Sequence, residues 1–241
     1  MSEKSSIKMM VVYDNNPYNK ELVTDWGFSC FVEGLEKSIL FDTGARGQIL
    51  LSNMKKLGLH PERIDAVVLS HAHRDHTGGL EELLKGNNGI EVWMPYFFPS
   101  DFRKKIREMG TSIVEVEKSR KICERAFTSG VLNGWIKEQA LILETKGGLI
   151  LMTGCAHPRI THIVSAVKGI FEKEIVLALG GFHLAGFDEE EIAGIVEKFR
   201  KMGVQKVGPC HCSGNDARIF FHEEYQKDFV EIGVGKEIEI Q

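Results

Sequence analysis

The segment His71-Ala72-His73-Arg74-Asp75-His76 places three imidazoles and a carboxylate within six residues. These are ligands that suit Zn²⁺ and its first-row neighbours. In an extended stretch, residues 71, 73 and 75 share one side. A tight turn at Asp75-His76 could then direct the last two side chains toward a second ion. A surface histidine-rich tract is the alternative, but the full pattern, followed by Thr77-Gly78-Gly79, favours a site for two divalent ions.

Three later turns each carry a histidine, and each follows a short apolar run. The turns are Gly154-Cys155-Ala156-His157, Gly180-Gly181-Phe182-His183 and Pro209-Cys210-His211-Cys212. Loops at the carboxyl ends of strands are where α/β proteins usually build their sites. We therefore expect these turns to converge on the first segment.

Apolar β-type runs alternate with amphipathic helical stretches along most of the chain, which indicates a layered α/β protein. The predicted strands are residues 9–13, 28–33, 38–41, 66–70, 140–144, 149–153, 175–179 and 206–208. The predicted helices are residues 48–57, about 78–85, 160–171 and 188–202. We find no low-complexity segment or linker, so the sequence predicts a single domain over residues 1–241.

The composition of the chain indicates which kinds of binding partner to expect. The formal net charge is −4, with acidic and basic residues intermixed, so there is no basic stripe to neutralise nucleic-acid phosphates. No apolar run approaches the roughly 20 residues needed to cross a bilayer. The five cysteines are irregularly spaced and no apolar signal segment is evident, so we expect a reducing cytoplasmic location. The expected partner is a small molecule, and the sequence does not predict an oligomeric state.

The pattern His-X-His-X-Asp-His after an apolar strand, with Phe41-Asp42-Thr43-Gly44 upstream, resembles the metallo-β-lactamase fold superfamily. The resemblance implies a four-layered αββα sandwich with a dinuclear site at one edge. It implies that His71 and His73 bind the first metal and that Asp75 and His76 bind the second.

The same resemblance gives roles to residues outside that segment. His211 matches the final metal ligand of the superfamily, and Asp42 matches a residue that braces the ligands from behind. Zn²⁺ is the expected metal, while Mn²⁺, Fe²⁺ and Mg²⁺ are compatible with the ligand types.

The middle ligands depart from the common pattern. Residues 135–139 contain no histidine, and Cys155 stands where many members have a bridging aspartate. His157 can supply the missing imidazole to the first metal. Cys155 is either a bridging thiolate, which would favour Zn²⁺, or a small buried residue. In an extended segment Cys210 and Cys212 would point away from His211, which favours small core residues over ligands.

His183 follows a Gly-Gly turn, where the backbone can approach a ligand closely. It could be a spectator, an extra metal ligand or a substrate contact. We favour a substrate contact that acts as a hydrogen-bond donor or proton carrier. Phe182 beside it is a candidate for the wall of a substrate pocket.

A larger set of motifs resembles one branch of the superfamily, to which a synthase of methanopterin biosynthesis belongs. The motifs are Asp14-Asn15-Asn16, Trp26-Gly27-Phe28-Ser29, Glu138-Gln139-Ala140-Leu141, Thr153-Gly154-Cys155-Ala156-His157, Gly180-Gly181-Phe182-His183-Leu184 and Pro209-Cys210-His211-Cys212-Ser213-Gly214. Many members of this branch are metal-dependent hydrolases without a known substrate.

Three functions follow. The first is a hydrolase in which a metal-bound hydroxide, oriented by Asp75, attacks an ester or phosphoester. The second is a transferase that joins a dihydropterin-methyl diphosphate to 4-(β-D-ribofuranosyl)aminobenzene 5'-phosphate and releases diphosphate. The third is a metal-binding protein without catalysis. The expected substrate of either enzyme is a small anionic or phosphorylated molecule.

Overall fold

The computed structural model describes residues 6–87 and 89–241, whose strands form two mixed sheets. The first sheet has the order β13-β1-β2-β3-β4-β5-β6. Its strands are β1 (Ile7–Tyr13), β2 (Ser29–Glu33), β3 (Ile39–Phe41), β4 (Ala66–Val68), β5 (Glu91–Pro95), β6 (Ser112–Val116) and β13 (Glu237–Ile240). The second sheet has the order β12-β11-β10-β9-β8-β7. Its strands are β7 (Lys118–Cys123), β8 (Ala126–Gly130), β9 (Leu141–Glu144), β10 (Leu149–Thr153), β11 (Ile175–Gly181) and β12 (Lys206–Cys210).

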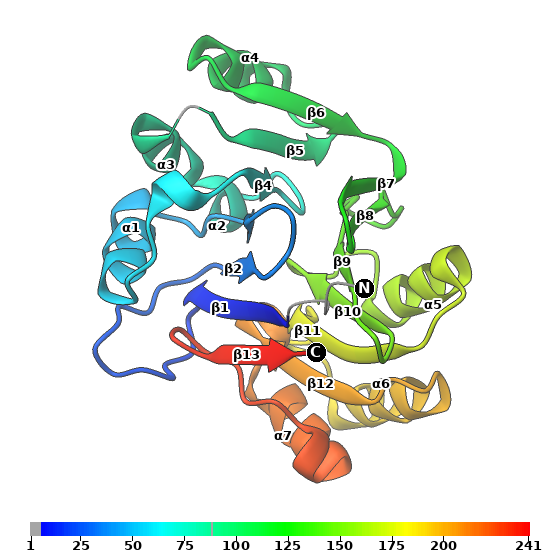
Figure 1. Ribbon diagram of the computed structural model, residues 1–241. Helices are drawn as coiled ribbons and strands as arrows, with labels where there is room; N and C mark the ends of the chain where they lie inside the picture. The colour runs from blue at the N-terminus through cyan, green and yellow to red at the C-terminus, as the bar shows by residue number, and fades with distance from the viewer. Residues whose placement is uncertain (1–5, 88) are drawn as a thin grey trace.

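Helices cover the outer faces of both sheets, which gives the four-layered αββα sandwich that the resemblance implied (Figure 1). The α-helices are α1 (Gly47–Lys56), α2 (Arg74–Thr77), α3 (Leu80–Gly86), α4 (Ser100–Glu108), α5 (Ile160–Phe171), α6 (Glu189–Lys201) and α7 (Asn215–Tyr225). Short 3₁₀ helices are η1 (Pro61–Arg63), η2 (His211–Ser213) and η3 (Gln226–Asp228). Helices α1, α3 and α4 pack on the first sheet, and α5, α6 and α7 pack on the second.

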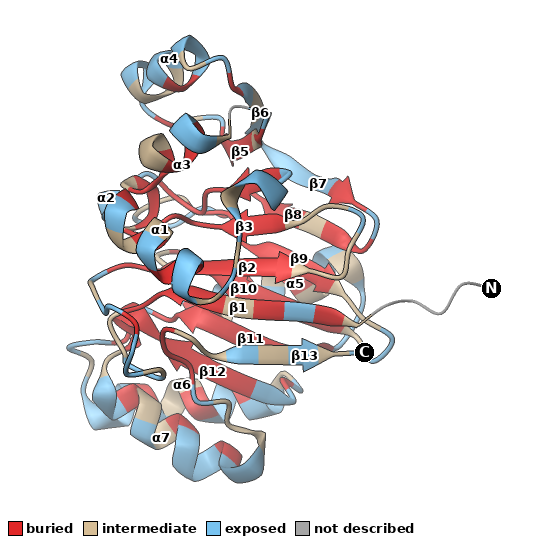
Figure 2. Ribbon diagram, turned by 60° about the vertical axis from the view of Figure 1, so that its left-hand side comes forward, coloured by how far each residue is buried: buried red, intermediate tan, exposed pale blue. Residues whose placement is uncertain are grey.

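The strand sequences explain why the sheets stack in this way. In β10, Ile150 and Met152 point into the core between the sheets, while Leu149 and Leu151 point into the core under the helices. Successive side chains of a strand face opposite sides, so a strand between two apolar layers is apolar at every position. Figure 2 shows the resulting buried band across the centre of the molecule.

Parallel pairing brings the loops of the site to one edge. Strands β3, β4 and β5 run parallel in the first sheet, and β10, β11 and β12 run parallel in the second. The loops after β4, β10, β11 and β12 contain the histidines that the sequence singled out. They meet because carboxyl ends of parallel strands share an edge.

The predicted strands and helices are confirmed with changes at their ends. Strand β4 ends at Val68 rather than at Ser70. The expectation of an extended segment through Asp75 was wrong, because α2 begins at Arg74 and one helical turn redirects the following side chains. Strands β5 to β8, strand β13 and helices α4 and α7 were not predicted.

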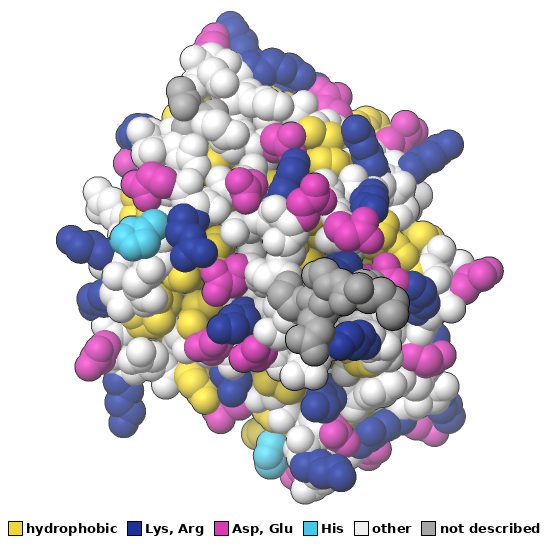
Figure 3. Space-filling view, viewed as in Figure 1, with side chains coloured by type: hydrophobic (Ala, Val, Ile, Leu, Met, Phe, Trp, Pro, Cys, Tyr) yellow, Lys and Arg dark blue, Asp and Glu magenta, His cyan; other side chains and the backbone are white. Residues whose placement is uncertain are grey.

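The surface agrees with the charge pattern of the sequence. On the face shown in Figure 3, Lys and Arg side chains are interspersed with Asp and Glu. Within the described ranges, no helix is both long and apolar enough to span a bilayer.

Candidate metal centre

Three imidazoles converge where the loop after β4 meets the loop after β10. Nε2 of His71 lies 3.1 Å from Nδ1 of His73, and Nε2 of His157 lies 3.3 Å from the same atom. Three nitrogens that bind one Zn²⁺ tetrahedrally at about 2.0–2.1 Å would be roughly 3.3 Å apart. The spacing of these three nitrogens therefore fits one metal ion. We call His71, His73 and His157 the first ligand group.

A second ligand group lies beside the first and contains Asp75, His76, Cys155 and His211, whose ligand atoms are within 4.8 Å of one another. Nε2 of His76 lies 3.2 Å from Sγ of Cys155 and 3.5 Å from Oδ2 of Asp75. Nε2 of His211 lies 3.3 Å from the same carboxylate oxygen and has no hydrogen-bond partner among the described residues. This donor set also fits a divalent cation.

Hydrogen bonds behind the ligands fix the directions of the rings. Oδ2 of Asp42 lies 2.7 Å from Nδ1 of His76 and accepts a hydrogen bond of 2.7 Å from the hydroxyl of Ser70. That hydroxyl lies 2.9 Å from Nδ1 of His71. Both rings therefore turn Nε2 toward the ligand groups, as metal-ligating histidines usually do when a second partner holds the other nitrogen.

Asn15 holds His211 in the same manner. Its side-chain oxygen lies 2.9 Å from Nδ1 of the ring, and its amide donates to the backbone oxygen of the same residue at 3.3 Å. The asparagine belongs to a motif that the sequence analysis noted, but no role was predicted for it.

The two ligand groups differ in protonation. Burial, together with the neighbouring imidazoles, lowers the pKa of His71 well below its usual value. Burial also lowers the pKa of His73, and it lowers that of His157 to about 3. The first group is therefore neutral near pH 7, with free lone pairs for a metal.

In the second group, burial disfavours a charged ring at His76, but Asp42 and then Asp75 outweigh it and raise the pKa to about 10. Burial would raise the pKa of Asp75, but the adjacent imidazoles of His211 and His76 hold it well below its usual range. Without metal, His76 is therefore an imidazolium between two carboxylates.

The buried side chain of Glu138 shapes the turn that carries Cys155 and His157. Its Oε1 accepts hydrogen bonds of 3.0–3.1 Å from the backbone N–H groups of residues 154, 155 and 156, and Oε2 accepts one of 3.0 Å from that of His157. Burial raises the pKa of this carboxyl, and the N–H donors offset part of the rise. No role was predicted for it from the sequence, where it stands in the motif Glu138-Gln139-Ala140-Leu141.

His183 and Cys212 lie next to the second group. The ligand atoms of Cys155, His183 and Cys212 are within 4.8 Å of one another. The expectation of an extended segment around His211 was wrong, because η2 curls the chain there and brings Cys212 to Cys155. Cys210 lies in the core between the sheets.

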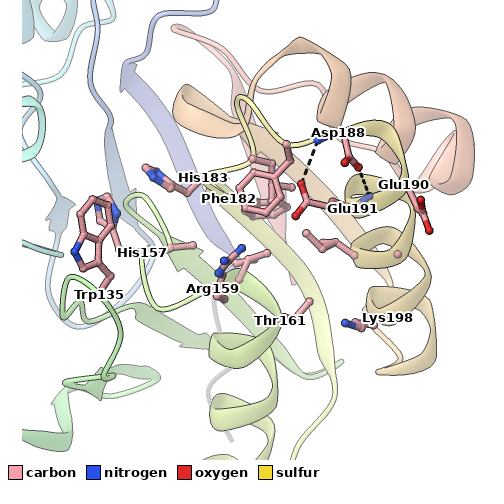
Figure 4. A pocket seen from close by; sticks show the side chains of 16 residues that line it. Trp135, His157, Arg159, Thr161, Phe182, His183, Asp188, Glu190, Glu191 and Lys198 are labelled. Carbon is pink, nitrogen blue, oxygen red and sulfur yellow. Dashed lines mark hydrogen bonds between the residues drawn. The ribbon is translucent and has the colours of Figure 1, made fainter.

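A cavity of about 780 Å³ opens beside the first ligand group (Figure 4). His157, His183 and the 91% exposed Trp135 line one end, and α6 lines the other. Arg159 lies between them, with its guanidinium 5.1 Å from the centre of the Phe187 ring. Phe182 also lines the cavity, although it is 1% exposed and packs against aromatic rings of α6 and α7.

The fold and this centre define a class of protein: αββα sandwiches with two adjoining groups of metal-ligand side chains at one edge of the sheets. Residues 27–169 match the metallo-beta-lactamase superfamily. The chain belongs to this superfamily and is a metal-dependent enzyme with its fold.

Individual relatives differ in their activities. The chain is 32% identical over 270 residues to the 7,8-dihydropterin-6-methyl-4-(beta-D-ribofuranosyl)-aminobenzene-5'-phosphate synthase of Methanocaldococcus jannaschii, covering 91% of each chain. It is 27% identical to Tm1679, a metal-dependent hydrolase of the beta-lactamase superfamily, at a TM-score of 0.84 over 97% of this chain and 99% of the other. The metallo-beta-lactamase fold protein YhfI of Bacillus subtilis shares the fold at a TM-score of 0.74 and 15% identity, covering 98% of this chain and all of the other.

Proposed function

We propose that this protein is a metal-dependent transferase that joins a dihydropterin-methyl diphosphate to 4-(β-D-ribofuranosyl)aminobenzene 5'-phosphate. The amine nitrogen would form a bond to the methylene carbon as the bond from that carbon to diphosphate breaks. The nitrogen loses its proton and diphosphate leaves. The observation that carries the proposal is the 32% identity to such a synthase along 91% of both chains.

The two ligand groups would hold two divalent ions, the first through His71, His73 and His157, and the second through Asp75, His76, Cys155 and His211. Zn²⁺ is our proposal for both, because the imidazoles of both groups and the thiolate of the second favour it over Mg²⁺. Bound there, the ions supply positive charge beside a departing diphosphate. Asp42 would act from behind by fixing the ring of His76.

The cavity offers groups for the rest of the substrates. Arg159 and Lys198 would neutralise phosphate, and Trp135 and Phe187 would contact a planar ring. Phe182 supports this wall. His183 would donate a hydrogen bond to the substrate from the cavity rim, and Asp75 would orient the attacking group.

Hydrolysis of an ester or phosphoester is the second candidate. Its support is the similarity to Tm1679 at a TM-score of 0.84 with 27% identity. The same ligand groups and cavity suit both reactions, because both develop negative charge on oxygen. We further propose that residues 1–241 act as one domain, since the ligand groups combine loops from both sheets, and that it works in the reducing cytoplasm, since all five cysteines are free.

The decisive experiment gives the metal-loaded protein the pterin diphosphate together with the aminobenzene phosphate. The expected result is the condensed product by mass spectrometry and one diphosphate for each product. Turnover of phosphodiesters or carboxyl esters, with no condensation, would instead establish the hydrolase.

His71→Ala is the test variant, because it removes a nitrogen of the first ligand group. We expect condensation to fall by at least about a hundredfold, as loss of a ligand weakens metal binding and its charge stabilisation. The matched control is His162→Ala, since His162 is exposed on α5 and outside both ligand groups. It should retain full activity.

A further inference from the structure

The side chains of Cys155, His183 and Cys212 form a compact cluster, with one ligand atom from each within 4.8 Å of the others. They come from the loops after β10, β11 and β12, the three parallel strands of the second sheet. The two cysteines are 3% and 4% exposed, whereas the histidine is exposed at the cavity rim. The cluster therefore connects the metal centre to the cavity.

Gly181 leaves the space in which these side chains meet. A Cβ at that position would lie 2.7 Å from Sγ of Cys212 and 3.1 Å from Cα of Cys155. The nearest atom to that Cβ would be the backbone oxygen of Gly154, at 2.2 Å, so the glycine is required first by the close approach of the two backbones, and it also leaves room for Sγ of Cys212. Sγ of Cys212 also lies 3.5 Å from the backbone oxygen of Cys155.

The donor atoms of this cluster favour a particular kind of metal ion. Two sulfurs and one imidazole nitrogen are a soft set that favours Zn²⁺ or Co²⁺ over Mg²⁺ or Ca²⁺. Two thiolates bound tetrahedrally to one Zn²⁺ at about 2.3 Å would be roughly 3.8 Å apart, which the 4.8 Å limit on this cluster allows. Three protein ligands would leave a fourth position for water or substrate.

The other cysteines provide the contrast. Cys30, Cys123 and Cys210 are buried in the core between the sheets and belong to no group of metal-ligand side chains in the described residues. Ordinary packing accounts for them, but it does not account for two thiols facing an imidazole at the edge of a metal centre.

We propose that Cys155, His183 and Cys212 bind a third, thiophilic divalent cation, which shares the sulfur of Cys155 with the second ligand group. Binding exchanges the thiol protons for the metal, so no oxidant or reductant is involved. One ring nitrogen of His183 binds the cation, and the other stays available to donate to a substrate.

The test is a Co²⁺ titration of the full-length protein, reduced, freed of metal and kept without oxygen. Thiolate-to-Co²⁺ absorption in the near ultraviolet reports the sulfur ligands, and metal analysis gives the equivalents bound. We expect the wild-type protein to bind three equivalents. Cys212→Ser should bind two and lose about two thirds of the thiolate absorption, since two of the three proposed sulfur-to-cobalt bonds are lost, while the matched control Cys210→Ser should equal the wild type.

His183→Ala keeps the test decisive if Cys212→Ser does not fold, because an exposed side chain can be truncated with little effect on stability. It should also reduce binding to two equivalents. His71→Ala should lose an equivalent and keep the thiolate absorption, which separates a failure of the first ligand group from a failure of the third site. A wild-type protein that saturates at two equivalents, or a Cys212→Ser protein with the wild-type spectrum, overturns the proposal.

Discussion

We expect the proton on His76 to couple Asp42 to metal binding at the proposed second site. Without metal, the pKa of this ring is about 10, so it is charged at pH 7 and a cation must displace its proton. The rings of His71 and His157 have lowered pKa values and are already neutral. The two ligand groups should therefore respond differently to pH.

We predict that the affinity of the second ligand group for a divalent cation increases by up to about tenfold for each pH unit between pH 7 and 10. The reason is that the proton on His76 competes with the cation over this pH range. Asp42→Asn removes the main charge that raises this pKa, so it should release about one proton fewer on metal loading at pH 7. Calorimetry in two buffers of different ionisation enthalpy measures that number. Equal proton release by both proteins would contradict the coupling.

Asn15 should act as a positioning residue for His211, since its side-chain oxygen lies 2.9 Å from Nδ1 of that ring. Asn15→Ala should weaken metal binding at the second ligand group by about 10–100-fold, which is typical when the partner of a ligating histidine is lost. Competition with a chelator gives the affinity. Asn19→Ala, in the same loop but outside the centre, is the control and should bind metal normally. If both variants bind equally well, Asn15 has no positioning role.

At the scale of elements, the turn after β10 depends on a single carboxylate. Glu138 accepts four backbone hydrogen bonds there. Glu138→Gln keeps the size but replaces one acceptor oxygen with a donor. An N–H group left without a partner in a buried position costs about 1–3 kcal/mol.

We therefore predict that Glu138→Gln lowers the free energy of unfolding by about 1–3 kcal/mol, measured by urea denaturation of metal-free protein. It should also weaken metal binding, because residues 155 and 157 lose their fixed positions. Glu62→Gln, at an exposed position in η1, should change stability by less than about 0.5 kcal/mol. A Glu138→Gln protein as stable as the wild type would show that the turn holds its shape without this carboxylate.

The elements that the sequence predicted best are those whose pattern is local. Helix α5 was predicted with the observed ends, and α6 begins after Asp188, whose side chain forms the N-cap. Residues 74–77 were misjudged because a single helical turn leaves no periodic signal. Strand β6, with partly exposed residues at most positions, shows no clear alternation.

The parts of the centre that could not be predicted depend on contacts between distant residues. Asn15 and His211 are separated by 196 positions, and Cys212 meets Cys155 only because η2 curls. No spacing along the chain encodes such contacts. The candidate ligands could be identified because each stands in a short motif at the end of an apolar run.

At the scale of the whole molecule, the candidate centre joins the two sheets. Residues 71–76 follow a strand of the first sheet, whereas Cys155, His157 and His211 follow strands of the second. Gln139, two residues before β9, makes another link, because its side-chain amide donates a hydrogen bond of 2.8 Å to the backbone oxygen of Leu69. Bound metal should therefore link the two sheets and stabilise their packing against each other.

Removal of metal should accordingly destabilise the entire fold. A ligand present at a hundredfold excess over its Kd stabilises the folded state by about 2.7 kcal/mol per site. For a chain of this size, each kcal/mol changes Tm by about 2–4 °C, so stripping one site should lower Tm by roughly 5–10 °C. Calorimetric scans before and after chelation, with metal content measured on the same samples, test this.

His71→Ala should regain only part of the lost Tm when metal is added, because it lacks the contribution of the first ligand group, whereas His162→Ala should regain the full Tm on reloading. If chelation removes the metal and Tm does not change, the ions bind without joining the sheets. A loss confined to one of two separate transitions would mean that the halves unfold independently. A single lowered transition is expected, because the apolar core between the sheets is shared by strands of both.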